Sequence, residues 1–227
     1  MQPWIHLDRV KVPGGGELKL ARRGDEFSIR LDTIELMNSR VSASEEALAT
    51  IGIEKIANCK APRILIGGLG MGFTLRAALA VAPPQATIVV SELLPAVVEW
   101  AREPMATLFN GCLDDPRVTI DTTDVGRIIR ERAGAWDAIL LDVDNGPDGM
   151  TQSANDGLYS SAGLSTSRRA LKPGGVLGVW SQGPDRDFAN RMRRHFEVEE
   201  VKVRAHRGKS GSRHVLWFGV AGKASAA

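Results

Sequence analysis

The chain has 227 residues, of which 43% are hydrophobic and 25% are charged, and its formal net charge at pH 7 is +2. These values are typical of one medium-sized soluble domain with at most a small appendage, and they exclude a nucleic-acid-binding protein that relies on bulk positive charge. The two cysteines, Cys59 and Cys112, lack metal-ligand spacing, and no apolar run approaches the length of a membrane span. We therefore expect a cytoplasmic protein with no metal, no membrane contact and no nucleic-acid partner.

The first part of the chain, from residue 4 to about residue 37, has the polarity pattern of β-structure. Residues 17–22 and 26–31 alternate in polarity around the turn at 23–25, which predicts a hairpin. A helix is expected over 42–58, with Ser42 as its N-cap and Glu45 at the capping-box position. Residues 1–58 are accordingly predicted to form an N-terminal β-hairpin and helix.

The rest of the chain alternates between predicted strands and helices, which indicates a mostly parallel sheet with helices on both faces. The predicted strands are 63–66, 86–91, 117–121, 136–141, 176–180, 197–204 and 214–220, and the predicted helices are 72–82, 95–109, 125–133, 157–171 and 185–195. The last two strands share a hairpin-length link and should pair antiparallel. We expect this α/β domain to occupy 59–222, with a disordered tail at 223–227.

A glycine-rich turn follows the first strand of this domain, and its glycines are Gly67, Gly68, Gly70 and Gly72. Glycine permits positive φ and close approach of a ligand, and a strand-to-helix turn directs backbone N–H groups toward that ligand. The next strand ends in Glu92, about twenty residues further on, where a carboxylate can accept hydrogen bonds from a ribose. The pattern predicts a site for a nucleoside-bearing cofactor; the alternative is a tight turn beside an exposed acid.

No frame in this turn provides the Gly-x-Gly-x-x-Gly pattern of an NAD site. The order of elements instead resembles class I S-adenosylmethionine-dependent transferases, and an apolar Ile66 before the glycines is similar to the spermidine and spermine synthase branch. Further segments carry the same resemblance across about residues 17–220: Thr74-Leu75-Arg76, Asp115-Pro116-Arg117-Val118, Trp136 to Asp142, and Leu171 to Gly175. The resemblance implies a Rossmann-like class I methyltransferase fold, with a mostly parallel seven-stranded sheet and a terminal antiparallel strand.

The resemblance also implies the cofactor and the roles of particular residues. The cofactor is S-adenosylmethionine or its decarboxylated form, with Gly67, Gly68, Gly70, Gly72 and Glu92 around the ribose and the amino-acid moiety. Asp124 matches the family's adenine-side aspartate. Asp142, at the end of a central strand, matches the acid that receives the proton of the attacking amine; a turn-forming or capping aspartate is the alternative. Spermidine synthases associate through N-terminal strands, which implies a homodimer.

The sequence departs from this family where the amine acceptor should bind. The Tyr-His-Glu motif is absent after Ser44-Glu45-Glu46, and in Asp142-Val143-Asp144-Asn145 the second acid is displaced. Asp144 and Asn145 are candidates for auxiliary polar contacts. Tyr159 is a candidate for the amine pocket, with a place in the core as the alternative.

The loop at 204–213 contains four cations and no acid. It is either a solvated turn or a clamp for an anionic group, and the second interpretation predicts that putrescine is a poor acceptor. The resulting hypothesis is a transferase that moves an aminopropyl or a methyl group onto an amine or another small nucleophile. The alternatives are a methyltransferase that acts on an acidic metabolite and a catalytically silent nucleoside-binding subunit.

Overall fold

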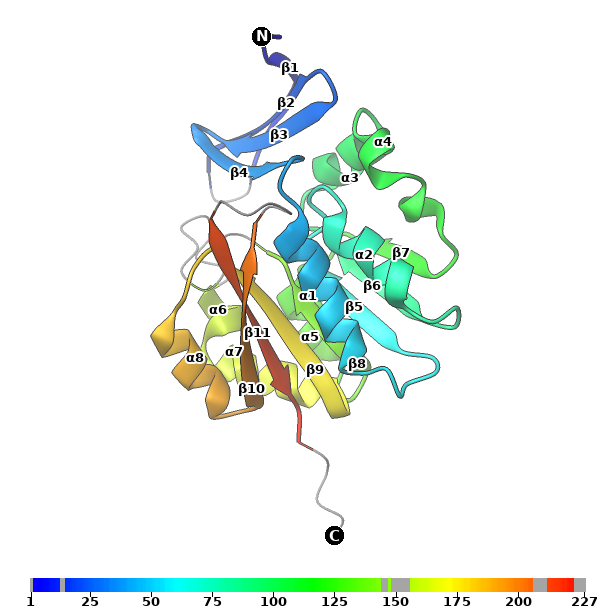
Figure 1. Cartoon of the computed structure of the whole chain (residues 1–227), viewed down its shortest axis with the longest axis vertical. Coiled ribbons are helices and arrows are strands. Elements are labelled where there is room, and N and C mark those ends of the chain that lie inside the picture. The colour runs from blue at the N-terminus through cyan, green and yellow to red at the C-terminus, as the bar shows by residue number, and fades with distance from the viewer. Residues whose placement is uncertain (1, 13–14, 144–146, 148–155, 206–211, 223–227) are drawn as a thin grey trace.

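The computed structural model describes residues 2–12, 15–143, 147, 156–205 and 212–222 (Figure 1). These residues form two sheets. A four-stranded sheet has the order β1-β2-β3-β4, and a seven-stranded sheet has the order β10-β11-β9-β8-β5-β6-β7. The tail at 223–227, predicted to be disordered, lies outside the described residues.

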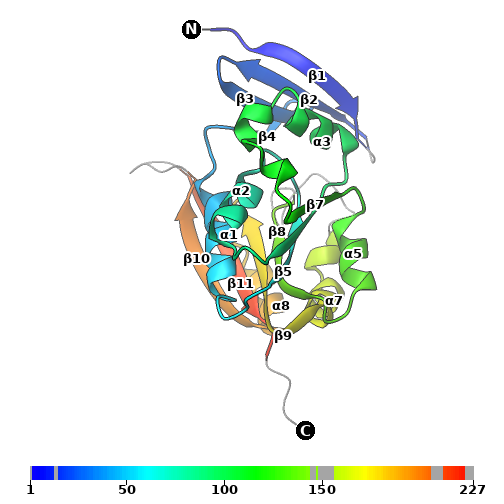
Figure 2. The ribbon, with the colours of Figure 1, turned by 90° about the vertical axis from the view of Figure 1, so that its right-hand side faces the viewer.

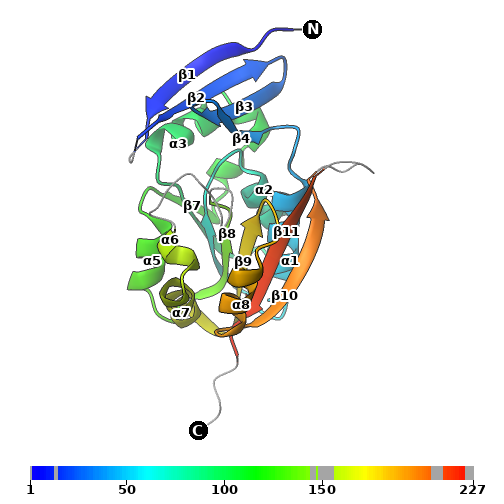
Figure 3. The same ribbon diagram turned by 90° about the vertical axis from the view of Figure 1, so that its left-hand side faces the viewer.

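The small sheet is antiparallel throughout, with strands β1 (Ile5–Lys11), β2 (Glu17–Arg23), β3 (Glu26–Leu31) and β4 (Ile34–Asn38). The predicted hairpin is the β2–β3 pair, and its inward side chains, Leu18, Leu20, Phe27 and Ile29, are buried. The turned views show this sheet stacked above the ends of the large-sheet strands (Figures 2 and 3). The small sheet therefore covers one end of the strands of the large sheet.

The large sheet has five parallel strands followed by an antiparallel closing strand and an edge strand. Its strands are β5 (Arg63–Gly67), β6 (Thr87–Ser91), β7 (Val118–Asp121), β8 (Trp136–Leu141), β9 (Leu171–Ser181), β10 (Glu197–Arg204) and β11 (Arg213–Val220). β11 pairs antiparallel with both β9 and β10. The predicted fold class is confirmed.

Helices cover both faces of the large sheet, and each face has its own apolar cluster. The helices are α1 (Ala43–Glu54), α2 (Phe73–Val81), α3 (Pro95–Arg102), α4 (Ala106–Phe109), α5 (Val125–Glu131), α6 (Asp156–Tyr159), α7 (Ser161–Ala170) and α8 (Arg186–Arg193), with a short 3₁₀ turn at Cys112–Asp114. α1 and α2 pack on one face, whereas α5, α7 and α8 pack on the other. None of the helices in the described ranges is long and apolar enough to cross a membrane.

Two predicted helices are each divided in the structure. The helix expected over 95–109 is α3 and α4, because Pro104 has no N–H to donate and disfavours helical geometry in the residue before it. The helix expected over 157–171 is α6 and α7, and Ser160 caps α7 by accepting a hydrogen bond from the Gly163 N–H at 3.1 Å.

The predicted capping box of α1 is wrong. Ser42 occupies the N-cap position, but its side chain makes no capping bond to the backbone. The Ser42 hydroxyl instead donates to the Glu46 carboxylate at 2.9 Å. Glu45, the predicted partner in the capping box, lines a cavity instead.

The strand order reverses direction between β5 and β8, which are neighbours in the sheet although β6 and β7 intervene in the chain. Parallel sheets of this type bind ligands beyond the carboxyl ends of the strands at such a reversal. The segments after β5 and β8 are joined directly here, because the Asp142 N–H donates to the Gly67 carbonyl at 2.9 Å. The topology thus places the glycine turn and Asp142 side by side.

Candidate functional site

The glycine turn after β5 forms one wall of a cavity between the two sheets. Gly68, Gly70 and Gly72 all have positive φ, at 92°, 49° and 75°. A β-carbon at Gly68 would lie 2.4 Å from the Asp142 carbonyl oxygen, and one at Gly70 would lie 2.9 Å from the terminal methyl group of Met37 on β4. The absence of side chains therefore lets both the β8 segment and the small sheet approach the turn.

Part of the hydrogen-bonding capacity of the turn is used within the protein. The Gly68 N–H donates to the Ser91 carbonyl and the Gly72 N–H donates to the Leu69 carbonyl, both at 2.8 Å. Gly68 and Gly70 line the cavity, whereas Gly67 ends β5 and Gly72 caps α2. Of the four predicted glycines, two thus face the cavity and two shape the turn.

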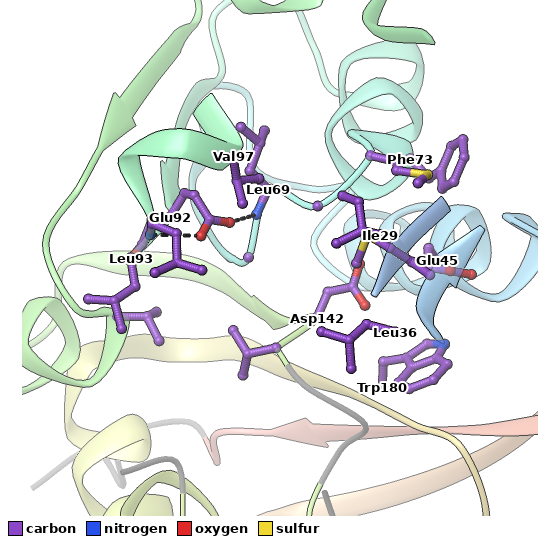
Figure 4. Close-up of a pocket in the computed structure, with 18 of the residues that line it drawn as sticks. Ile29, Leu36, Glu45, Leu69, Phe73, Glu92, Leu93, Val97, Asp142 and Trp180 are labelled. Atoms are coloured by element: carbon purple, nitrogen blue, oxygen red, sulfur yellow. Dashed lines mark hydrogen bonds between the residues drawn. The ribbon is translucent and has the colours of Figure 1, made fainter. Parts of the chain in front are cut away.

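Glu92 follows β6 and is 9% exposed. Its carboxylate accepts hydrogen bonds from the Leu69 N–H and from the Leu94 N–H, each at 3.0 Å (Figure 4). An ionised carboxylate has about four acceptor positions, so these two bonds orient the group without exhausting it. Glu92 lines the cavity directly after β6, where the sequence predicts a ribose-binding acid.

Asp124 lines the same cavity and also caps α5. Its Oδ1 accepts the Arg127 N–H at 2.8 Å, and the Arg130 guanidinium lies 3.7 Å from the same oxygen. The capping bond fixes the direction of the side chain, and the second carboxylate oxygen can serve as a ligand acceptor.

Asp142 follows β8 and Glu45 lies in the first turn of α1, and both line the cavity (Figure 4). The Thr74 hydroxyl of α2 donates to Asp142 Oδ2 at 2.6 Å, and the Ser44 hydroxyl donates to Glu45 Oε2 at 2.6 Å. Burial raises the pKa of Asp142 to about 6. Burial, and then the charge of Asp142, raise the pKa of Glu45 to about 7. Both carboxyl groups therefore have pKa values above the ordinary range of a carboxylic acid.

The remaining predicted residues have different places. Asp144 and Asn145 lie outside the described residues. Tyr159 is buried in the second apolar cluster, with its ring 5.7 Å from that of Phe188, and it is not among the cavity-lining residues. Its hydroxyl donates to the carbonyl of Val143, a lining residue, at 3.4 Å. This placement favours the core-facing alternative for Tyr159.

The lining of the cavity is apolar apart from a few acids. Its apolar part comes from both sheets and includes Leu18, Ile29, Leu36, Leu69, Phe73 and Trp180. Every charged residue that lines it in the described part of the chain is a carboxylate: Glu45, Glu92, Asp124 and Asp142. Such a lining suits a ligand that has an apolar body and positive charge.

Glu45 is the site residue that the sequence interpretation missed. Its position three residues after Ser42 fits a capping box, and the sequence interpretation therefore assigned it to the helix terminus and not to the cavity. The acidic pair Glu45-Glu46 was nevertheless a signal, because a helix whose first turn lies at the carboxyl ends of the strands can direct an acid into the crevice there.

Comparison with known proteins agrees with this arrangement. The spermine/spermidine synthase domain matches residues 42–192. A polyamine aminopropyltransferase of Mycobacterium tuberculosis (strain ATCC 25618 / H37Rv) is 30% identical over 172 residues, which are 74% of this chain and 31% of that protein. Polyamine aminopropyltransferase 1 of Streptomyces coelicolor is 35% identical over 123 residues, or 53% of this chain and 22% of the relative. The chain therefore spans about a third or less of the length of these curated relatives.

Solved structures show the same fold. The spermidine synthase from Thermotoga maritima superposes with a TM-score of 0.76 at 19% identity, covering 96% of this chain and 74% of that one. A spermidine synthase in complex with the transition state analogue AdoDATO gives a TM-score of 0.75, also at 19% identity, with 96% and 73% covered. The family domain covers more than half of the sequence and includes the glycine turn, Glu92, Asp124 and Asp142. The chain belongs to the spermine/spermidine synthase family.

Proposed function

We propose that the protein transfers the aminopropyl group of decarboxylated S-adenosylmethionine to an amine acceptor. The observation that carries this proposal is the charge of the cavity, whose charged lining residues within the described ranges are all carboxylates. Decarboxylated S-adenosylmethionine carries a sulfonium and an ammonium and no carboxylate, so it complements this lining. S-adenosylmethionine would add its own carboxylate to a site that already contains four acids.

The family relationship supports the same choice, since the curated relatives are named polyamine aminopropyltransferases. An acidic lining also opposes the alternative of a methyltransferase with an acidic substrate. Two acids in one cavity whose pKa values are raised by burial weigh against a catalytically silent subunit, because burying them costs stability and groups of this kind occur most often at functional sites.

In the proposed reaction the neutral nitrogen of the acceptor attacks the aminopropyl carbon attached to sulfur. The new C–N bond forms as the C–S bond breaks, and the electron pair of the C–S bond remains on the sulfur of 5′-methylthioadenosine. Glu92 orients the ribose, and Asp124 accepts a hydrogen bond from the adenine amine. Asp142 takes the proton that the attacking nitrogen must lose, and Glu45 pairs with an ammonium of the acceptor.

The expectation that putrescine is a poor acceptor had two reasons, the loss of acids and the cationic loop. Glu45 in the cavity removes much of the first reason. The second depends on residues 206–211, which lie outside the described residues, so this expectation stays a prediction. The cytoplasmic location and the division of the chain into domains also stay predictions. A homodimer remains part of the proposal, and exposed apolar side chains of the small sheet, Ile5 and Ile34, support association there.

The proposal is tested by incubating the protein with decarboxylated S-adenosylmethionine and a panel of diamines and polyamines, followed by mass spectrometry. We expect equal amounts of 5′-methylthioadenosine and an acceptor heavier by one aminopropyl group. The parallel incubation with S-adenosylmethionine should give no methylated amine. A methylated product there, with none from the decarboxylated form, would contradict aminopropyl transfer.

The acid pair predicts how activity depends on pH. Both carboxyl groups must be ionised, one to receive a proton and the other to pair with an ammonium, and their pKa values are raised to about 6 and about 7. We therefore expect kcat/KM to rise with pH across this window. Because these two acids bind protons more tightly in the folded state, the free energy of unfolding of the ligand-free protein should fall as pH rises from their ordinary pKa values of 3.8 and 4.5 to about 7, and level off above that. A pH-independent kcat/KM between pH 5.5 and 7.5, roughly one unit around the pair, would contradict these roles.

A further inference from the structure

A chain of three hydrogen-bonded side chains connects the cavity to the antiparallel strand β11. Glu45 Oε2 accepts a hydrogen bond from the Ser44 hydroxyl at 2.6 Å, and Ser44 Oγ lies 2.8 Å from Nδ1 of His214. Ser44 has no exposed surface and His214 is 8% exposed, so the contact between them is shielded from water. Ser44 and His214 are 170 residues apart in the sequence. Neither residue belongs to the cavity lining itself.

The number of protons fixes the direction of these bonds when Glu45 is ionised. The serine hydroxyl has one proton, and the carboxylate can only accept, so Ser44 must donate to Glu45. The contact between Ser44 and His214 then requires that Nδ1 of His214 carries a proton and donates to Ser44 Oγ. A donor behind the hydroxyl polarises its O–H bond, which strengthens the hydrogen bond to the carboxylate in a site of low polarity.

The surroundings of His214 restrict where its ring can lie. The ring of Trp180, a cavity-lining residue of β9, meets the imidazole edge-on with centroids 4.7 Å apart. The start of α1 is held at the same place, because the Ala43 N–H donates to the Ala205 carbonyl just after β10, at 3.3 Å. Three strands of the sheet therefore contribute to the position of the Glu45 carboxylate.

We propose that Ser44 and His214 are positioning residues, which hold the Glu45 carboxylate in the orientation that pairs with the ammonium of the amine acceptor. This inference rests on the proposed function and adds a requirement to it: acceptor binding depends on a histidine that does not touch the acceptor. The nucleoside end of the cavity, formed by Glu92 and the glycine turn, is independent of this hydrogen-bond chain.

The test measures amine binding by calorimetry in protein saturated with 5′-methylthioadenosine, so that no turnover occurs, with putrescine and spermidine as the probes. Ser44→Ala and His214→Ala should each weaken amine binding about tenfold, as expected when a hydrogen bond to a charged group is lost. Both should leave the affinity for 5′-methylthioadenosine unchanged. His214→Asn places an amide N–H donor near the position of Nδ1, and it should restore most of the amine affinity.

The results separate this proposal from a packing role and from the proposed function. If His214→Ala binds amines as tightly as the wild type does, the positioning role is wrong. It is also wrong if His214→Asn and His214→Ala lose the same affinity, because the packing of the ring would then be what matters. Thermal denaturation identifies a variant that fails to fold, and the comparison then depends on His214→Asn and Ser44→Ala. If the wild type binds neither amine, the proposed function fails, and the positioning role fails with it.

Discussion

Asp142→Asn should lower turnover by about a hundredfold or more and leave nucleoside binding nearly unchanged. Asparagine has the shape of aspartate and can still accept the Thr74 hydroxyl hydrogen bond, but it cannot take a proton from the attacking amine. The charge of Asp142 also raises the pKa of Glu45, so the pH midpoint of any residual activity should move down. Steady-state kinetics with decarboxylated S-adenosylmethionine, together with calorimetry of 5′-methylthioadenosine, measure the two effects separately.

Asp121→Asn is a matched control for this experiment. Asp121 ends β7, the edge strand of the same parallel sheet, accepts the Thr123 N–H at 2.9 Å and does not line the cavity, so its replacement should leave turnover unchanged. Wild-type turnover in the Asp142 variant would return Asp142 to the role of a turn-forming residue.

Glu92→Gln should weaken nucleoside binding by about tenfold to a hundredfold, because two hydrogen bonds from ribose hydroxyls to a charged acceptor become bonds to a neutral one. The same change affects the fold. The carboxylate now accepts the N–H groups of both Leu69 and Leu94, and an amide nitrogen in place of one oxygen would face an N–H donor. We expect a lower melting temperature, corresponding to about 1–3 kcal/mol of lost stability.

Glu99→Gln is the control for Glu92→Gln. Glu99 lies on the exposed face of α3, outside the cavity lining. Replacing it with glutamine removes the same charge without changing the site. Calorimetry with 5′-methylthioadenosine, at a temperature where both variants are folded, gives the comparison. Equal affinities in the two variants would contradict the ribose assignment of Glu92.

The parts of this site that could be predicted from the sequence are those fixed by local geometry. Gly68 and Gly70 need positive φ and space that no β-carbon could share, and Glu92 follows a strand whose direction and neighbours are set by the parallel sheet. These features can be recognised in the sequence because each depends on a few consecutive residues. Pro104 also indicates that the helix is interrupted there, although the apolar spacing of 95–109 favours a single helix.

The contributions of α1 and β11 could not be predicted in the same way. Glu45 lines the same cavity as Asp142 because the first turn of α1 lies at the carboxyl ends of the strands, and this packing produces no recognisable pattern in the sequence. The contact between Ser44 and His214 depends on the same packing and on the register of β11 against β9. The place of Tyr159 could not be predicted for a similar reason. The rotation of the single-turn helix α6 decides whether its ring faces the cavity or the core.

The central claim is that the acidic cavity selects the decarboxylated cofactor. Calorimetric titration of the wild-type protein with S-adenosylmethionine and with decarboxylated S-adenosylmethionine, under identical conditions, compares two ligands that differ only in one carboxylate. Two like charges about 4 Å apart cost on the order of 4 kcal/mol near a protein surface before screening by salt, and water in the cavity reduces this cost. We expect the decarboxylated form to bind at least about tenfold more tightly, which corresponds to about 1.4 kcal/mol. Equal affinities, or tighter binding of S-adenosylmethionine, would contradict the account.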